Sequence, residues 1–219
     1  MAVLESISTE YRKKAIEKHE KDKLLCKKGN YKIGKDTIIL NMGFATHCPS
    51  AARGLCKIVN KGYALKAEKM YKAVLPYRER QADQWRRLPV CVYIEKLKRM
   101  IEKSKKGKHP IKYVRFNESG DFYDQSCVLK LDLIARALKG LAKVYTYTAR
   151  RDLRIAGVCD NLNIVTSGFD LFGFTRFLPV KKASGSRPLC PADCTVCGMC
   201  KSRYNLRANQ SMIIEVIIH

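Results

Sequence analysis

The sequence has few histidines and no glycine-rich motif of the kind that cradles phosphates. Only 4 histidines occur among 219 residues, and they are far apart in the chain. None can be argued into a Ser/His/Asp triad, so nucleophilic catalysis of that type is not expected. No segment matches the phosphate-binding loops of nucleotide-binding proteins either. The four histidines are His19, His47, His109 and His219.

The chain also lacks an apolar run of membrane-spanning length, since the longest one covers only residues 212–218. Its first 14 residues carry mixed charges and no apolar signal region. We therefore expect no membrane contact and a cytoplasmic, reducing environment. In such an environment, clustered cysteines indicate a metal site rather than disulfides.

Acidic residues are scarce relative to basic ones. The sequence has 20 Asp and Glu against 43 Lys and Arg, which gives a formal net charge of +23. A potential of this sign attracts polyanions, of which nucleic acid is the most common inside a cell. Nucleic acid is therefore an expected partner, with solubility or partners of another kind as the alternative. The candidates for an exposed basic stripe are Arg78, Arg80, Arg86 and Arg87.

Cysteine is concentrated in one loop, residues 187–203. Four of the 10 cysteines fall within eleven residues, in the order C-P-A-D-C-T-V-C-G-M-C. Two relaxed disulfides do not fit so short a segment, because each needs its own spacing and direction of the Cβ atoms. Four thiolates can instead turn inward around one centre, as in the compact loops that bind a [4Fe–4S] cluster. The expected ligands are Cys190, Cys194, Cys197 and Cys200.

Zinc is the alternative metal for this loop, followed by disulfides or free thiols. Structural zinc usually joins two C-x2-C pairs that a longer segment separates, and this loop has no such segment. With four ligands the site would be coordinatively closed, so we expect any reaction to take place elsewhere. We also expect the loop to follow the last crossover of the fold, outside the alternating strands.

A second group of soft ligands follows the first expected strand. His47, Cys48 and Cys56 lie in the segment FATHCPSAARGLCK. Three ligands are the minimum for a second metal or cluster site, and loop packing with free thiols is the alternative.

Strand-like and helix-like segments alternate through most of the chain. Strands are expected at residues 36–42, 111–117, 143–150, 161–168, 174–180 and 212–219. Helices are expected at residues 4–28, 63–87 with a break at Pro76, 90–105, 124–140 and 150–158. This alternation predicts an α/β fold whose mainly parallel sheet forms a partial or complete (β/α) barrel-like structure. We expect residues 1–30 to form an N-terminal helix and residues 31–219 to form one α/β domain.

Polar residues gather at the carboxyl ends of three expected strands, where α/β proteins bind their ligands. Glu118 and Asp121 could act as acid and base, and Arg150 could hold a carboxylate or phosphate. Capping of the next helix is the alternative role for Asp121 and Ser119. The expected cofactor-binding residues are Asn117, Ser119, Thr148 and Ser167.

Six segments, taken in order, resemble the phage gene product 88-like family of uncharacterised proteins. They are THCPSAARGLCK, GYALKAEKMY, RFNESGDFYD, VYTYTAR, NLNIVTSG and the four-cysteine loop. That family is similar to radical SAM-like phage proteins, in which a C…C…CYA arrangement opens the fold. The resemblance implies an iron–sulfur protein in which Cys48 and Cys56 match the first two cysteines and S-adenosylmethionine is a ligand. Gly62 stands at the third position, which departs from a three-cysteine cluster.

Two functions follow from these observations. The first is an iron–sulfur enzyme of radical SAM-like ancestry, with nucleic acid as a candidate substrate. The second is a non-catalytic, basic nucleic-acid-binding protein that a zinc or cluster site stabilises.

Overall fold

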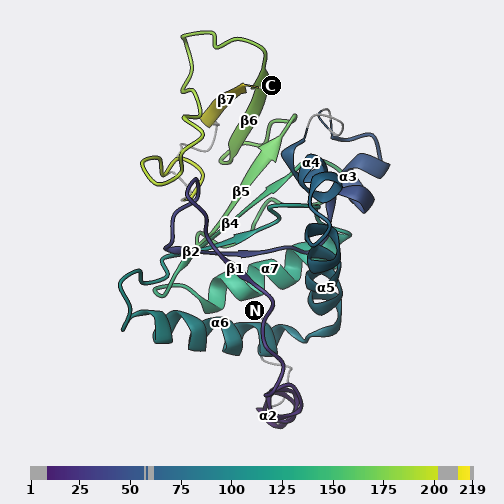
Figure 1. Ribbon diagram of the computed structural model, residues 1–219, viewed down its shortest axis with the longest axis vertical. Coiled ribbons are helices and arrows are strands. Elements are labelled where there is room, and N and C mark those ends of the chain that lie inside the picture. The colour runs from purple at the N-terminus through teal and green to yellow at the C-terminus, as the bar shows by residue number, and fades with distance from the viewer. Residues whose placement is uncertain (1–8, 57, 59–61, 202–211, 218–219) are drawn as a thin grey trace.

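The strands of the sheet lie side by side in the order in which they follow one another in the sequence (Figure 1). The structure, a computed structural model, describes residues 9–56, 58, 62–201 and 212–217. Strands β2 to β7 are parallel, and β1 at one edge runs antiparallel to β2. The expected α/β fold with a mainly parallel sheet is confirmed. The strands are β1 (Lys27–Lys28), β2 (Thr37–Leu40), β3 (Tyr113–Phe116), β4 (Lys143–Thr148), β5 (Leu162–Ser167), β6 (Thr175–Val180) and β7 (Met212–Ile217).

The long helices lie along one face of this sheet (Figure 1). Crossovers between parallel strands are right-handed, so strands that are added in one direction keep their helices on the same face. No helix in the described ranges is both long and apolar enough to cross a membrane. The helices are α2 (Thr9–Lys18), α3 (Pro49–Ala52), α4 (Tyr63–Met70), α5 (Val74–Arg87), α6 (Val90–Ser104) and α7 (Gln125–Ala137), with a 3-10 turn η1 (Ala45–His47).

The main core lies between the sheet and these helices. Val114 of β3 and Val144 of β4 point toward the helices, because alternate residues of a strand face opposite sides. Trp85 of α5 is buried at this interface, and its ring meets Tyr93 and Phe116 edge-on at centroid distances of 5.3 and 5.5 Å. The single tryptophan therefore joins α5, α6 and β3.

The opposite face of the sheet carries a smaller core and the four-cysteine loop. This second cluster consists of Val165, Cys200 and Ile214. The loop belongs to the connection between β6 and β7, so it precedes the last parallel strand. The expectation that it follows the last crossover is therefore wrong, because residues 212–217 pair with β6 along its full length.

The N-terminal helix is shorter than expected. It ends at Lys18 rather than at residue 28, and residues 4–8 lie outside the described part of the chain. The Leu25 amide donates to Gln84 Oε1 at 2.7 Å, and Gln81 Nε2 donates to the Leu25 carbonyl oxygen at 2.8 Å. Side chains of α5 thus bind the backbone groups that a longer helix would pair. The chain then enters β1, so the sheet begins before residue 31.

The expected helix at residues 63–87 is divided, but not at the proline. The break covers residues 71–73, and Pro76 lies in the first turn of α5. The first turn of a helix has no intrahelical acceptor for its N–H groups, so a proline costs little there.

Residues 150–158 form turns, which corrects the short helix expected there. Besides hydrogen bonds within the turn, their backbone pairs with side chains of α7. The Arg154 amide donates to Gln125 Oε1 at 2.9 Å, and the Cys159 amide donates to Asp132 Oδ1 at 2.7 Å. The connection from β4 to β5 therefore crosses without a helix of its own.

Candidate functional site

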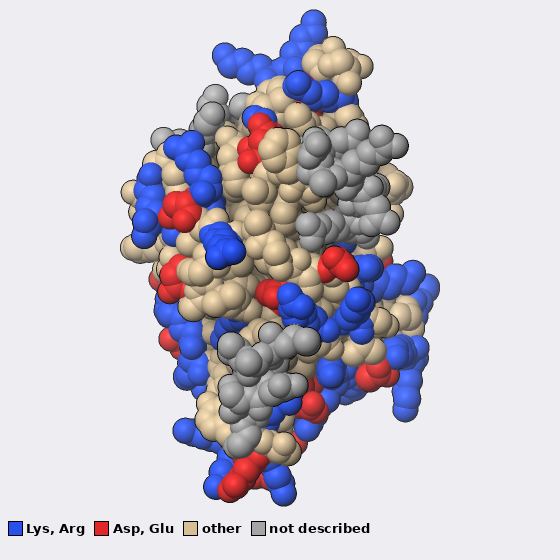
Figure 2. Space-filling model, turned by 180° about the vertical axis from the view of Figure 1, so that it is seen from behind, with Lys and Arg blue, Asp and Glu red and all other residues tan. Residues whose placement is uncertain are grey.

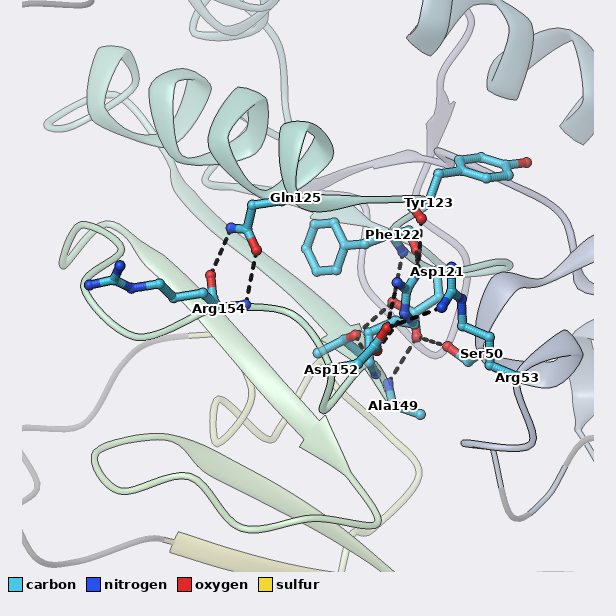
Figure 3. A network of polar contacts seen from close by, with 11 residues as sticks. Ser50, Arg53, Asp121, Phe122, Tyr123, Gln125, Ala149, Asp152 and Arg154 are labelled. Atoms are coloured by element: carbon cyan, nitrogen blue, oxygen red, sulfur yellow. Dashed lines mark hydrogen bonds and ion pairs between the residues drawn. The ribbon is translucent and has the colours of Figure 1, made fainter.

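The carboxyl ends of β3 and β4 meet at a buried carboxylate, that of Asp121 (Figure 3). Its Oδ1 accepts hydrogen bonds from Thr148 Oγ1 and from the Phe122 amide, both at 2.7 Å. Its Oδ2 accepts hydrogen bonds from the Ala149 amide at 2.9 Å and from the Ser50 hydroxyl. Burial raises the pKa of Asp121, and the four donors oppose this by favouring the carboxylate. Asp121 thus ties the loop after β2 to the ends of β3 and β4.

Arg150 is also buried and also binds neighbouring groups. Its Nη1 donates to the carbonyl oxygens of Phe122 and Tyr123 at 2.5 and 2.9 Å. Its Nε and Nη2 donate to the two carboxylate oxygens of Asp152 at 2.7 and 2.8 Å. The guanidinium therefore fixes the turn after β4 against the loop after β3. Its expected role in holding an anionic ligand stays a prediction.

A second buried carboxylate, Glu68 of α4, was not among the expected site residues. It accepts hydrogen bonds from the amides of Ala45 and Thr46 and from the Ser119 hydroxyl, at 2.8, 2.9 and 2.8 Å. Arg78 Nη1 lies 2.9 Å from the same carboxylate. Burial acts to raise the pKa of Glu68, but these donors hold it below its ordinary value. No local signal marks Glu68, because glutamate in a lysine-rich helix is typical of a solvated face.

Arg78 is buried, with 5% of its surface exposed, which corrects its expected place in an exposed basic stripe. Its guanidinium lies between two carboxylates. Besides the contact with Glu68, its Nη2 lies 3.7 Å from Glu118 Oε2. Among the described residues, the Glu118 carboxylate forms an ion pair with Arg78 alone. Of the two residues expected to act as acid and base, Glu118 therefore has the side chain that is more available to a substrate.

The expected cofactor-binding residues are divided between two places. Asn117 follows β3 in a left-handed conformation with φ of 57°, and its Oδ1 accepts a hydrogen bond from the Met42 amide at 3.2 Å. Ser119 and Thr148 donate to the two buried carboxylates. These three residues lie together at the ends of β3 and β4, whereas Ser167 ends β5. We call the bonded residues around Asp121, Glu68 and Arg150 the strand-end network.

The loop after β2 holds the second group of expected metal ligands. The His47 ring packs edge-on against Phe44, with centroids 5.1 Å apart. Cys48 precedes α3, where burial raises the pKa of its thiol, and the Cys56 amide donates to the Ser50 carbonyl oxygen at 3.2 Å. In the part of the chain that the structure describes, no three His, Cys, Asp or Glu side chains are grouped to hold a metal ion. The second metal site stays a prediction.

The four-cysteine loop is held to the sheet at three points. The Cys190 amide donates to the Glu215 carbonyl oxygen of β7 at 2.8 Å. The Cys194 amide donates to a carbonyl oxygen in the loop before β2 at 2.6 Å. Asn163 Nδ2 of β5 donates to the Cys200 carbonyl oxygen at 2.8 Å. Strands β5 and β7 and the loop before β2 thus position this loop.

All four thiols of the loop line one small cavity against the sheet. The facing walls are side chains of the strands, which close the cavity with aromatic and aliphatic surface. No three potential ligands in the described part of this region are grouped to hold a metal ion. The facing side chains are Tyr145, Tyr147, Phe177 and Ile214.

Burial raises the pKa of two thiols of this cavity. It raises the pKa of Cys200 to about 12, and a hydrogen bond from Tyr147 lowers this pKa only in part. Burial also raises the pKa of Cys194, although the charges of Arg115 and Lys201 oppose it. A metal that binds these groups as thiolates therefore has to displace their protons.

Arg115 of β3 connects this cavity to the strand-end network. Its Cζ lies 4.8 Å from the ring centroid of Tyr147, which lines the cavity. Its Nη2 donates to Tyr63 Oη at 3.1 Å, and Tyr63 Oη donates to the Glu118 carbonyl oxygen at 2.8 Å. A continuous line of side-chain contacts thus joins the two candidate sites.

Exposed lysines surround the amino end of the sheet. They lie at or just before the starts of β2, β3 and β4, and the Lys143 amide donates to the Lys112 carbonyl oxygen at 2.9 Å. Figure 2 shows many basic side chains along the margins of the rear face, with mostly uncharged surface and a few charged side chains between them. We call the exposed residues Lys35, Lys106, Lys108, Lys112 and Lys143 the lysine rim.

These features define a class of protein: an α/β protein whose parallel strands follow in sequence order, with helices on one face and a cysteine loop on the other. A family model described as gene product 88 matches residues 6–175. The chain therefore belongs to the gene product 88 family. The match includes the strand-end network and the loop with Cys48 and Cys56, and it ends before the four-cysteine loop. Comparisons with curated proteins and with solved structures gave no match.

Proposed function

We propose that this protein is an iron–sulfur protein whose four-cysteine loop holds a [4Fe–4S] cluster against the sheet. The observation that carries the proposal is that all four thiols of one short loop line a single cavity. A cubane bound by four cysteines takes its ligands at short intervals, and its surroundings control access of water. The aromatic and aliphatic wall of the sheet supplies those surroundings. When bound, such a cluster supplies one-electron transfer or a cross-link within the fold.

The spacing of the cysteines in the sequence favours a cluster over a single zinc ion. Structural zinc usually joins two C-x2-C pairs that a longer segment separates, and this loop has no such segment. A cubane is larger than one ion, and each of its four cysteine ligands binds a different iron, which suits ligands at short intervals. Zinc remains the alternative.

The strand-end network is where we propose that a reaction takes place, in an enzyme of radical SAM-like ancestry. Asp121 and Arg150 bind the ends of neighbouring strands, so they position the site. Glu118 is the candidate acid or base, since its carboxylate lies 3.7 Å from Arg78 and is otherwise available. The net charge of +23 is consistent with nucleic acid as the substrate.

The residues for S-adenosylmethionine are a partial set. The loop after the first parallel strand carries Cys48 and Cys56, and Gly62 occupies the third position of the C…C…CYA arrangement. Gly62 is the N-cap of α4 and has φ of −66°, a conformation that any residue adopts. The loop therefore supplies two of the three cysteine ligands that such a cluster needs, and no step is assigned to S-adenosylmethionine.

Anaerobic reconstitution with iron and sulfide tests the proposed cluster. The wild-type protein is expected to bind about four irons and four sulfides per chain, with thiolate-to-iron absorption near ~410 nm. Cys197→Ser and Cys200→Ser should each lose most of the bound iron, because each variant removes the ligand of one iron. Iron, sulfide and zinc are measured in the same samples after desalting.

Cys159→Ser is the matched control for this experiment, because Cys159 lies outside both cysteine loops. It should bind as much iron as the wild-type protein. One zinc and no iron per chain after reconstitution would show that the loop binds zinc rather than a cluster. Unchanged iron in both loop variants would refute the assigned ligands.

Binding of nucleic acid without catalysis is a second candidate function, and the lysine rim favours it. Each phosphate that a lysine neutralises releases counter-ions, so affinity for DNA or RNA should fall steeply with salt. Replacing Lys106 and Lys108 with glutamine should reduce the slope of log K against log salt by about 0.9 for each duplex-DNA phosphate that is no longer neutralised. Fluorescence anisotropy at several salt concentrations measures this slope.

The control replaces Lys181 and Lys182, which are exposed after β6, with glutamine. Both double variants remove the same charge, so the comparison separates position from net charge. Equal slopes in the two variants, or affinity that salt does not change, would exclude the lysine rim as the interface.

A further inference from the structure

Lys201 is a buried lysine at the edge of the four-cysteine cavity. It directly follows Cys200, and 6% of its surface is exposed. Its Nζ lies 4.6 Å from the ring centroid of Tyr113 and 3.4 Å from the Ile33 carbonyl oxygen. Within the described ranges, no carboxylate forms an ion pair with it. A buried ammonium group thus has a ring and a carbonyl as direct partners, but no carboxylate bonded to it in the described structure.

The carboxylate of Asp193 lines the same cavity, and the charge of Lys201 helps to lower its pKa, although the hydrogen bonds from Thr195 contribute more. It accepts hydrogen bonds from the Thr195 amide at 2.8 Å and from the Thr195 hydroxyl at 2.5 Å. Asp193 is therefore bound within its own turn and makes no ion pair with Lys201 in the described structure.

Arg115 is a second cation near the thiols. Its guanidinium lies over Tyr147 and contacts Tyr63, while its buried Nε has no hydrogen-bond partner among the described residues. It likewise makes no ion pair with a carboxylate within the part of the chain described. Two positive charges therefore stand beside the cavity that the four cysteines line.

A buried cation without a counter-ion is costly, so this arrangement calls for a negative charge in the cavity. Four thiolates around a centre of charge +2 carry two net negative charges, whether the centre is Zn²⁺ or an oxidised [4Fe–4S] cluster. We infer that Lys201, assisted by Arg115, is the counter-charge that lets the cavity hold an anionic metal–thiolate centre. This inference rests on the proposed function, and it assigns Lys201 as a positioning residue for that centre.

Zn²⁺ alone is the probe for the first test, with a chromophoric chelator as competitor. Removal of a group that supports a metal site typically costs 10–100-fold in affinity. Lys201→Met is therefore expected to bind Zn²⁺ roughly 10-fold more weakly than the wild-type protein. Lys201→Arg, which keeps the charge, should remain close to wild type. Lys112→Met is the control, because it removes an exposed lysine and should leave the affinity unchanged.

Stability of the metal-free protein is the second readout. Without a metal, the buried charge is unpaired, so Lys201→Met should raise the urea midpoint while it weakens Zn²⁺ binding. In the cluster-loaded protein, the same variant should have a more negative reduction potential, because a nearby cation favours the reduced cluster. A lysine that merely supports the fold would lower the urea midpoint when replaced.

The outcomes separate this inference from the proposed function. A wild-type protein that binds neither Zn²⁺ nor a cluster would overturn both. Normal binding by the wild type, with equal affinities in Lys201→Met and Lys112→Met, would overturn the counter-charge alone. A lower urea midpoint in metal-free Lys201→Met would also overturn it, because the lysine would then be structural.

Discussion

Replacing Asp121 with alanine is expected to lower the free energy of unfolding by about 3–5 kcal/mol. The substitution removes a buried carboxylate and leaves four donors without an acceptor. Two of these donors are the backbone amides of Phe122 and Ala149, which have no room to turn toward water. Urea unfolding followed by circular dichroism measures the loss.

Asp160→Ala is the control for this prediction, because Asp160 is exposed in the turn before β5. It should change the free energy of unfolding by no more than about 0.5 kcal/mol. A similarly small loss in Asp121→Ala would show that the strand-end network does not hold the ends of β3 and β4 together. A catalytic role for Asp121 would then be better supported than a structural role.

Replacing Gly120 with alanine is the second substitution with a large expected effect. Gly120 has φ of +75°, and an added Cβ would lie 2.5 Å from the carbonyl carbon of Gly43 and 2.7 Å from its Cα. The left-handed backbone costs about 1–2 kcal/mol for a residue with a Cβ, and forcing atoms into a packed site adds about 1–3 kcal/mol. We expect urea unfolding to show a loss of about 3 kcal/mol.

Gly157→Ala separates the two contributions. Gly157 has φ of +85°, but an added Cβ there meets no atom within 4 Å. This variant should lose only the backbone contribution, about 1–2 kcal/mol. Equal losses in the two variants would mean that the loops after β2 and β3 do not approach as closely as the structure places them.

Both substitutions act on the frame that holds Glu118. Gly120 lets the loop after β3 pass the loop after β2, and Asp121 then joins this loop to the end of β4. The two residues lie close to Glu118 in sequence, so either change should also disturb the place proposed for the reaction. Loss of stability and loss of function are therefore expected to occur together at this site.

The sequence was sufficient to predict the fold because its main signal is local. Short β-branched runs alternate with helical segments, and parallel strands with right-handed crossovers follow from that alternation. Two of the errors in secondary structure occurred where distant side chains bind the backbone. Gln81 and Gln84 bind the segment after the N-terminal helix, and Gln125 holds the turn after β4. Such contacts join segments far apart in sequence, so no local pattern reports them.

For the candidate site, the sequence predicted the location but not the contacts that its side chains make. The rule that ligands gather at the carboxyl ends of strands placed Glu118, Asp121 and Arg150 in one region. It could not show that Asp121 and Arg150 already bind neighbouring groups. It also missed Glu68 and Arg78, because a charged pair in a basic helical segment looks solvated until the tertiary structure buries it.

The cysteine loop shows the same division between sequence and tertiary structure. Its spacing alone predicted that the four cysteines come together, since short intervals leave the chain little freedom. The tertiary structure decided which surface those thiols face and which charges stand beside them. Arg115, Tyr147 and Lys201 come from separate parts of the chain, and they meet at the cavity only because the sheet places β3, β4 and the last crossover together.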